Sequence, residues 1–235
     1  MLEVLNTGIH SARENMRFDE KLLEELKTPV LHLYQWERPS ATYGYFIRPE
    51  KHLDVRKAEL WRLDLARRPT GGGIVFHIWD LAFSFLLPSS HPAFSLSTLE
   101  NYRFVNQVVL EVLREGFGLS ALLIPQNAPS LGPDCQNFCM AKPTQYDVVH
   151  EGMKMAGAAQ RKQKQGYLHQ GTISLAYPQI DLLNDVLLSK KEVVEAMKAY
   201  TFAPLGRLWE PAQLQKARLE LQKLLAHKLQ LALNF

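Results

Sequence analysis

The chain has 235 residues, of which 46% are hydrophobic and 22% are charged, so it can bury a large core and does not have the composition of a disordered protein. Its formal net charge of +3 is too small to indicate nucleic-acid binding. The amino terminus lacks the apolar core of a signal peptide, and no run approaches the roughly 20 apolar residues that span a bilayer. We therefore expect a cytoplasmic protein that binds neither nucleic acid nor membrane.

The first part of the chain predicts one helix followed by strands. Residues 13–26 carry apolar side chains at roughly helical spacing, and Pro29 closes the segment. The run "VLHLYQW" at residues 30–36 is typical of a strand, and "RPSATYGYF" predicts a loop that leads into another. The apolar run "LAFSFLL" at residues 81–87 predicts a further strand.

The middle of the chain predicts a helix, a loop and a hairpin. Ser97 and Glu100 form a capping-box pattern, and the apolar positions that follow keep helical spacing until "GFG". Residues 120–143 are rich in proline and glycine and are read as a loop. The segment "YDVVHEGMKMAGAAQ" alternates about Glu151 and Gly152, which is typical of a hairpin.

The last part predicts one more strand, "GTISLAY" at residues 171–177, and an amphipathic helix from Pro211. Residues 178–210 give no clear pattern and are open to several interpretations: a lid, a carrier-docking surface, or loops and helices that cover the core. Clustered strands with flanking helices indicate an α+β fold. No repeat or clear linker divides the chain, so we expect a single domain over residues 1–235.

The stretch "RRPTGGGIVFH" at residues 67–77 is the first candidate for chemistry. Three consecutive glycines, Gly71, Gly72 and Gly73, either form a tight turn or leave bare backbone for a ligand. Their amides could form an anion-binding nest, beside the positive charge of Arg67 and Arg68. On this motif alone, a plain loop and a phosphate or carboxylate site are equally open.

Lys154 is the second candidate, because Met153 and Met155 flank it rather than charged residues. The small residues at 157–159, among them Gly157 and Ala158, would let a ligand pack beside it. A lysine ammonium there could stabilise negative charge on an acyl or phosphoryl oxygen. The plain alternative is a lysine on an exposed strand face.

Cysteine and histidine residues supply further candidates. Cys139 lies in the proline-rich loop and is either a thiol nucleophile or a small buried apolar side chain. Cys135 has less support, and two cysteines in a cytoplasmic protein favour neither a disulfide nor structural zinc, so we expect no metal site. His77 and His169 could bind substrate or act as acid or base, or be held by hydrogen bonds within a sheet.

Five motifs together resemble one family. "NMRFDEKLL", "YQWERPSATYGYF", "RRPTGGGIVFH", "YDVVHEGMKMAGAAQRK" and "LHQGTISL" occur in the order and at the spacing of the lipoate-protein ligases, octanoyl and lipoyl transferases and biotin-protein ligases. The match covers about residues 10–177. The resemblance implies a catalytic domain similar to the class II aminoacyl-tRNA synthetase and biotin-lipoate ligase fold, with a mixed β-sheet flanked by helices and a cleft for an acyl chain.

The resemblance also implies a reaction and partners. Members attach lipoate or octanoate to one lysine of a lipoyl domain of the 2-oxoacid dehydrogenase complexes or of the glycine-cleavage H protein. Lys154 matches the lysine placed against the acyl carbonyl or adenylate phosphate, and Gly71–Gly73 match the loop beside the acyl chain and nucleotide. The carboxy-terminal residues 178–235 are expected to be a helical appendage without a full accessory domain.

Two details favour different branches of the family. "TGGGIVFH" resembles the ligases, whereas "CMAKPTQYD" resembles the segment that bears the cysteine nucleophile of the transferases. Ile78 stands where the family often has aspartate after the histidine. The leading expectation is a lipoate-protein ligase that uses ATP and Mg²⁺ to form lipoyl-AMP. The alternatives are an octanoyl or lipoyl transferase with Cys139 as nucleophile and a lipoyl-domain binding module without catalysis, with biotin transfer ranked last.

The ligase expectation assigns a role to each site residue. Lys154 would stabilise the acyl-adenylate, and Arg68 with Gly71–Gly73 would hold the phosphate and the acyl chain. Substrate and nucleotide contacts are also expected from His77, Gly157, Ala158 and His169. Val75, Phe76 and Phe85 are possible walls of the acyl slot, although alternation along a strand lets only some of them face it.

Overall fold

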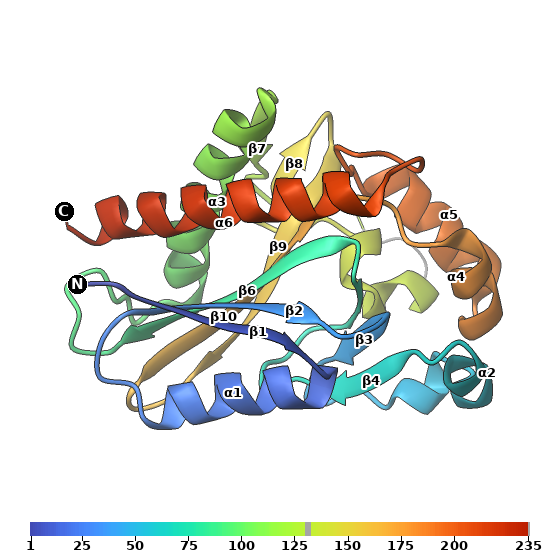
Figure 1. Ribbon diagram of the computed structural model, residues 1–235, viewed down its shortest axis with the longest axis horizontal. Coiled ribbons are helices and arrows are strands. Elements are labelled where there is room, and N and C mark those ends of the chain that lie inside the picture. The colour runs from blue at the N-terminus through green and yellow to red at the C-terminus, as the bar shows by residue number, and fades with distance from the viewer. Residues whose placement is uncertain (130–132, 235) are drawn as a thin grey trace.

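A computed structural model describes residues 1–129 and 133–234 of the chain (Figure 1). Its centre is a seven-stranded sheet in the order β1-β2-β6-β10-β9-β8-β7. These strands are β1 (Glu3–His10), β2 (Val30–Trp36), β6 (Asp80–Pro88), β7 (Ala121–Leu123), β8 (Val148–His150), β9 (Met153–Lys162) and β10 (Gly166–Ser174). β1 and β2 are parallel and all other neighbours are antiparallel, so the sheet is mixed, as expected.

A second, three-stranded sheet has the order β4-β3-β5. Its strands are β3 (Ser40–Tyr43), β4 (Asp64–Arg67) and β5 (Ile74–His77). The α-helices are α1 (Ala12–Glu24), α2 (Val55–Leu60), α3 (Thr98–Phe117), α4 (Ile180–Val186), α5 (Lys190–Tyr200) and α6 (Pro211–Leu233). Short 3-10 helices cover η1 (Pro49–Lys51), η2 (Pro133–Asn137) and η3 (Cys139–Ala141). The expected α+β fold is confirmed.

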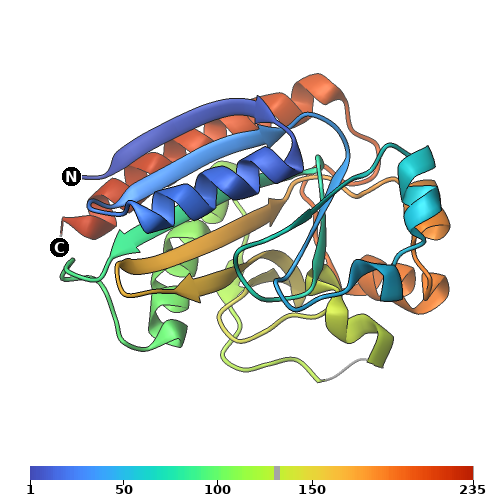
Figure 2. The ribbon, with the colours of Figure 1, turned by 90° about the horizontal axis from the view of Figure 1, so that it is seen from below.

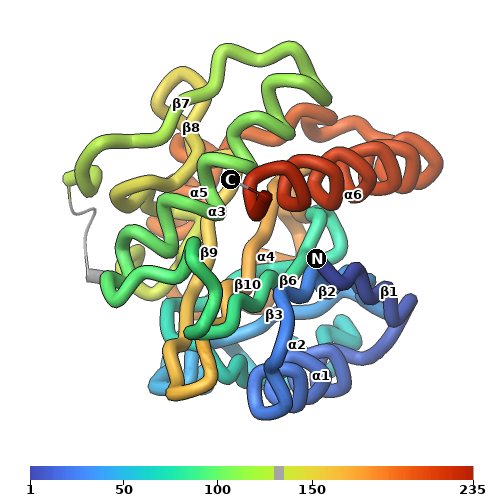
Figure 3. The backbone as a smooth tube through the Cα atoms, turned by 90° about the vertical axis from the view of Figure 1, so that its left-hand side faces the viewer, coloured from blue at the N-terminus to red at the C-terminus, as the bar shows by residue number. Residues whose placement is uncertain are grey.

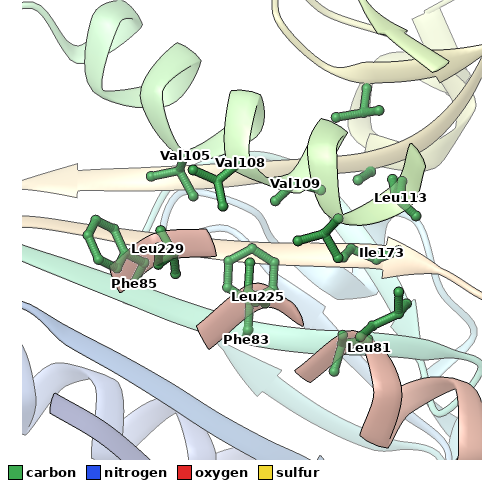
Figure 4. Close-up of a cluster of buried hydrophobic side chains, with 14 of the residues drawn as sticks. Leu81, Phe83, Phe85, Val105, Val108, Val109, Leu113, Ile173, Leu225 and Leu229 are labelled. Atoms are coloured by element: carbon green, nitrogen blue, oxygen red, sulfur yellow. The ribbon is translucent and has the colours of Figure 1, made fainter. Parts of the chain in front are cut away.

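Helices cover both faces of the large sheet. Figure 3 shows α3 and α6 on one side and α1 on the other, and Figure 2 shows α1 lying along the strands. In Figure 4 the apolar side chains of α3 and α6 meet those of β6 and β10, among them Phe83, Val109 and Leu225. Burial of this apolar surface stabilises the sheet and leaves the opposite face for α1 and the small sheet.

Local sequence signals place several elements correctly. The expected helix at residues 13–26 forms as α1 and begins after Ser11 with a complete capping box. Ser97 caps α3 by accepting a hydrogen bond from the Glu100 N–H. The hairpin turns where predicted, because Glu151 and Gly152 both have positive φ angles, of 50° and 78°.

The sequence did not predict some elements, and it predicted the start of one strand several residues after its observed start. The sequence did not predict β1, an edge strand in which no residue is fully buried, so it lacks the apolar run of a buried strand. β10 begins at Gly166 rather than residue 171. The expected loop at residues 120–143 contains β7, η2 and η3, and residues 130–132 of it lie outside the described residues.

The segment at residues 178–210 forms α4 and α5, which pack on the loop that precedes the hairpin. Their apolar side chains share a cluster with Cys135, Phe138 and Met140. Thr201 Oγ1 donates a hydrogen bond to the Met140 carbonyl at 2.7 Å, and the Phe202 N–H donates to the Lys154 carbonyl at 2.9 Å. This segment therefore holds both the cysteine loop and the strand that carries Lys154. Within the described part of the chain, no helix combines the length and hydrophobicity needed to cross a membrane.

Candidate active site

A pocket lies between the large sheet, the small sheet and α1. Its lining is mainly apolar, with a small number of polar groups, which is typical of a site for an acyl chain or another small molecule. It is lined by Met16, Tyr34, Trp36, Thr42, Arg68, Val75, His77, Ala82, Cys139, Met140, Lys154, Gly157, Ala158, Ala159, Gln170, Gly171 and Thr172.

Lys154 is almost fully buried on β9 and points into this pocket region. Its Nζ lies 2.7 Å from Asp147 Oδ2 and donates a hydrogen bond to the Cys139 carbonyl at 2.9 Å. A buried ammonium is stable only when it is paired and hydrogen-bonded, and this one has both kinds of partner. The same contacts bring the cysteine loop and β9 together.

Asp147 is held by donors in addition to the lysine. Tyr102 donates its hydroxyl hydrogen to Oδ1, and Thr144 donates to Oδ2 from its backbone N–H at 2.6 Å and from its hydroxyl at 2.9 Å. The Ala158 N–H in turn donates to the Tyr102 hydroxyl at 2.9 Å. These bonds fix the carboxylate, and with it the position of the lysine ammonium.

Gly157 is required by the path of the Lys154 side chain. A Cβ built on Gly157 would lie 2.4 Å from Lys154 Cε, 2.6 Å from its Nζ and 2.7 Å from Asp147 Oδ1. Those separations are shorter than any van der Waals contact. The space beside Gly157 is therefore occupied by the ion pair of Lys154 and Asp147. The sequence had suggested that a ligand would pack there.

The glycine loop contacts Cys139 directly. The Gly73 N–H donates to Cys139 Sγ at 3.1 Å. A Cβ on Gly73 would lie 2.3 Å from the Asn137 carbonyl oxygen, so the loop that carries the cysteine can approach only because this position is glycine. Gly72 has a φ of 84°, and a Cβ there would lie 3.6 Å from Cys139 Sγ.

Arg68 is buried and turned towards the protein. Its Nη1 donates to Thr42 Oγ1 at 2.8 Å, and its Nη2 donates to the carbonyls of Gly71 and Gly73 at 3.0 and 2.7 Å. Burial lowers the pKa of the guanidinium, while its neighbour Cys139 acts in the opposite direction. Arg68 thus shapes the glycine loop and places a positive charge beside the cysteine.

His77 belongs to a buried polar chain at the end of β5. Its Nδ1 lies 2.7 Å from Asp80 Oδ2, its Nε2 lies 2.7 Å from Thr42 Oγ1, and its ring stacks on Trp36 at 4.2 Å. Thr42 also accepts the hydrogen bond from Arg68. Asp80 comes three positions after His77, so it provides the carboxylate contact that Ile78 cannot make.

The pocket brings together most of the residues expected at the site. Arg68, His77, Cys139, Lys154, Gly157 and Ala158 line it, and Gly71, Gly72 and Gly73 form the loop whose carbonyls and amide bond to Arg68 and Cys139. Of the three expected walls, Val75 lines the pocket. Phe76 and Phe85 pack in the two large hydrophobic clusters instead.

The structure does not bring His169 into the pocket. Its neighbour Gln170 lines the cavity, and alternation along β10 turns His169 to the opposite face. There it hydrogen-bonds to the Gln160 amide at 2.9 Å and lies near the rings of Phe83 and Tyr102. Burial lowers the pKa of His169 to about 3, so the ring is neutral.

Sequence reasoning missed Asp147, Tyr102, Thr42 and Gln170 as parts of the site. Asp147 offered one signal, a lone carboxylate directly before the apolar start of β8, where a buried charge needs a partner. The others gave no such signal. Gln170, for example, donates to Asp19 Oδ2 at 2.6 Å and accepts from Thr70 Oγ1 at 2.7 Å, across 151 and 100 positions of sequence.

The catalytic domain of one protein family matches this chain. The pattern described as the lipoyl protein ligase A/B catalytic domain covers residues 11–204. The chain belongs to this family of enzymes. The resemblance drawn from the five sequence motifs is therefore confirmed.

Relatives within the family are named octanoyltransferase LipM. One from Staphylococcus aureus is 34% identical over 195 residues, which are 80% of this chain and 70% of the relative. One from Anoxybacillus flavithermus is 36% identical over 179 residues, 73% of this chain and 64% of the relative, and one from Bacillus cereus is 32% identical over 206 residues, 83% and 73%. These relatives overturn the expectation of an ATP-dependent lipoate-protein ligase.

Solved structures support the fold. Protein Ta0514 of T. acidophilum with bound lipoic acid superposes with a TM-score of 0.70 at 22% identity, covering 97% of this chain and 86% of that one. A lipoate-protein ligase A bound with ATP also gives 0.70, at 24% identity and with 96% and 85% covered. The expected relationship to the lipoate ligase fold is confirmed. The bound ATP and lipoic acid are properties of those proteins.

Proposed function

We propose that this protein is a cysteine-dependent octanoyltransferase that moves an octanoyl group from a thioester donor to a lysine of a lipoyl domain. The observation that carries the proposal is the position of Cys139, whose sulfur lies 3.1 Å from the Gly73 N–H on the wall of the mainly apolar pocket that Lys154 also lines. Acyl transfer needs a nucleophile, positive charge near the reacting carbonyl and an apolar pocket for the chain. Cys139, the cations Arg68 and Lys154, and the pocket lining provide these parts. The named relatives support the same assignment.

The first step forms an acyl-enzyme. The thiolate of Cys139 attacks the carbonyl carbon of the donor thioester, and the tetrahedral intermediate expels the donor thiolate, which takes up a proton. The octanoyl chain occupies the space between Met16, Trp36 and Val75. The Gly73 amide and the Lys154 ammonium are the N–H donors from which an oxyanion can be stabilised.

The second step forms the amide. The neutral amine of the acceptor lysine attacks the thioester carbon and forms the C–N bond, and the C–S bond breaks so that Cys139 leaves as a thiolate. The proton that the amine loses passes to solvent, and the enzyme returns to its starting state. Because the donor is already a thioester, no adenylate is required and ATP and Mg²⁺ are not part of this reaction. In the described residues, no group of three or more histidine, cysteine, aspartate or glutamate side chains is arranged to hold a metal ion.

The acceptor is proposed to be a lipoyl domain of a 2-oxoacid dehydrogenase complex or a glycine-cleavage H protein. One structural neighbour is described together with its E2 lipoyl domain, at a TM-score of 0.70 and 22% identity, covering 96% of this chain and 83% of that one. That likeness supports the fold, and the acceptor class rests on the family. Action on such domains in the cytoplasm stays a prediction.

An intact-mass assay tests the proposal. The protein is incubated with octanoyl carrier protein and an apo lipoyl domain, without ATP, and quenched in acid to preserve thioesters. We expect an octanoyl mass shift on the lipoyl domain and, when the acceptor is omitted, the same shift on Cys139. Cys139→Ser should lose both shifts.

Cys135→Ser is the matched control. Cys135 is buried, and its thiol donates to the Glu192 carbonyl at 3.6 Å, away from the pocket lining. This variant should keep the acyl-enzyme and the transfer. An unaltered rate for Cys139→Ser would exclude the cysteine mechanism, and binding of the lipoyl domain without any transfer would favour a binding module.

A further inference from the structure

Arg218 reaches from the C-terminal helix α6 into the core beneath the site. It is 9% exposed, its Nε donates to the Asp80 carbonyl at 2.8 Å, and its Nη2 donates to the Ile78 carbonyl. Both carbonyls belong to the turn that follows His77. The helix lies beyond residues 11–204, which the family pattern covers, so no match to that pattern assigns Arg218 a role.

The turn that Arg218 contacts is strained. Ile78 has a φ of 96°, a region that β-branched residues rarely occupy, and such a conformation persists only where its surroundings hold it. The Ile78 N–H donates to Asp80 Oδ1 at 3.1 Å, and Arg218 binds the carbonyl on the other side of the same residue. The carboxylate and the guanidinium therefore clamp Ile78 from both ends.

Hydrogen bonds lead from the clamp to Arg68, which lies beside the cysteine. Asp80 Oδ2 lies 2.7 Å from His77 Nδ1, and His77 Nε2 lies 2.7 Å from Thr42 Oγ1. Thr42 accepts a hydrogen bond from Arg68, whose guanidinium lies beside Cys139. A Cβ on Gly72 would lie 3.2 Å from Arg68 Nη2 and 3.6 Å from Cys139 Sγ, so both groups border the same glycine.

The two ends of this chain have fixed roles, because the Arg68 guanidinium donates and the Asp80 carboxylate accepts. His77 therefore carries a proton on Nδ1 towards Asp80, and Thr42 Oγ1, which accepts from Arg68, can give its hydroxyl hydrogen to His77 Nε2. Burial would raise the pKa of the Asp80 carboxyl, but His77, a Thr172 hydrogen bond and Arg218 hold it below its ordinary value. Asp80 is thus kept as the acceptor that the arrangement needs.

We infer that Arg218 is a positioning residue for octanoyl transfer: it fixes the Ile78–Asp80 turn so that Asp80, His77 and Thr42 hold Arg68 beside Cys139. This inference rests on the proposed function for its reaction, but its geometry stands on the hydrogen bonds alone. It assigns α6 a part in the site in addition to its packing on α3.

Three variants test the inference in the full chain. Arg218→Met keeps the buried stem but removes the donors, and Arg218→Lys keeps the charge with a single donor group. Lys223→Met makes the same charge change at an exposed position of the same helix and serves as control. The measurements are kcat and KM for octanoyl transfer, the ¹⁵N NMR signals of the His77 ring, and the rate of Cys139 alkylation by iodoacetamide.

For Arg218→Met we expect kcat to fall on the order of tenfold or more with KM within about twofold, because the groups around the sulfur are displaced while the acyl pocket remains. The His77 ring signals should shift, because the hydrogen bond between Nδ1 and Asp80 is displaced, and the rate of Cys139 alkylation should change. Arg218→Lys should lie between Arg218→Met and the wild type, and Lys223→Met should match the wild type. If Arg218→Met does not fold, Arg218→Lys carries the same test.

Wild-type kcat, His77 signals and alkylation rate in Arg218→Met, or in Arg218→Lys where only that variant folds, would overturn the inference. A fall in thermal stability with those three readouts unchanged would do the same, since it would leave Arg218 with a packing role only. Failure of the proposed function gives a different result, because the wild type would then show no octanoyl transfer while the NMR and alkylation readouts would still report on the positioning.

Discussion

Lys154 Nζ lies 2.7 Å from Asp147 Oδ2, and both side chains are buried, with exposed fractions of 5% and 0%. The pair joins the strand that carries the lysine to the segment that follows the cysteine loop. Within the described residues, Asp147 has three further donors, from Tyr102 and Thr144, whereas Lys154 has one other partner, the Cys139 carbonyl. The charge of Lys154 therefore depends more on Asp147 than the charge of Asp147 depends on Lys154.

This difference predicts that removing Asp147 destabilises the fold more than removing Lys154 does. Asp147→Asn should lower the free energy of unfolding by about 3–5 kcal/mol, because it leaves a buried ammonium without its counter-charge. Lys154→Met should cost less, since Asp147 keeps three donors, but it should abolish acyl transfer. Urea unfolding of both variants measures the difference. Equal costs would show that Tyr102 and Thr144 do not compensate the carboxylate.

Gly157→Ala should displace the Lys154 ammonium, because the added Cβ would lie 2.4 Å from Cε and 2.6 Å from Nζ. We expect octanoyl transfer to fall on the order of a hundredfold and stability to fall by about 1–3 kcal/mol. In a Lys154→Ala background most of the clash is absent, so the stability cost should shrink. A double-mutant cycle on unfolding free energies checks this, and purely additive costs would contradict the clash.

Tyr102→Phe should lower stability by about 1–3 kcal/mol, because it leaves the Ala158 N–H without its acceptor and removes one donor to Asp147. Tyr167→Phe is the matched control. The Tyr167 hydroxyl is also buried but has no hydrogen-bond partner in the described residues, so its loss should be neutral or stabilising. Thermal melts of the two variants compare them, and the reverse order of stability would refute the role of the Tyr102 hydroxyl.

His169 should make the fold sensitive to acid. Its folded pKa is about 3 and its ordinary value is 6.5, so below pH 6.5 the unfolded chain takes up a proton that the folded chain does not. Stability from this group is therefore complete above pH 6.5 and declines as the pH falls towards 3, by up to about 5 kcal/mol.

Unfolding free energies at pH 7 and pH 4 test this dependence. His169→Phe removes the titration and should reduce the difference between the two values, since Phe83 and Tyr102 already surround the site with rings. A pH dependence identical to that of the wild type would show that folding does not lower the pKa of His169.

Residues close in sequence allowed good predictions because their physical causes are local. The cap at Ser97 needs only an N–H three positions away, and the hairpin needs only two residues that tolerate positive φ at 151 and 152. Order and spacing of five motifs were enough to place the chain in its family. Gly73 shows what local sequence could not predict. The three-glycine pattern to which it belongs resembles that of the ligases, but the contact of Gly73 with Asn137 and Cys139 depends on a loop more than 60 positions away.

The sequence by itself therefore determined the α+β class, the helices α1, α3 and α6, most of the buried strands, and the set of residue types from which the site is built. Only the tertiary structure decided that Asp147 neutralises Lys154, that Arg68 turns its donors onto its own glycine loop, and that His169 faces away from the pocket. It also brought Arg218 to the turn after His77, across 138 residues from Asp80. Periodicity and caps follow from backbone geometry over a few residues, whereas a buried polar group takes whichever partner the packing of distant elements brings within hydrogen-bond reach.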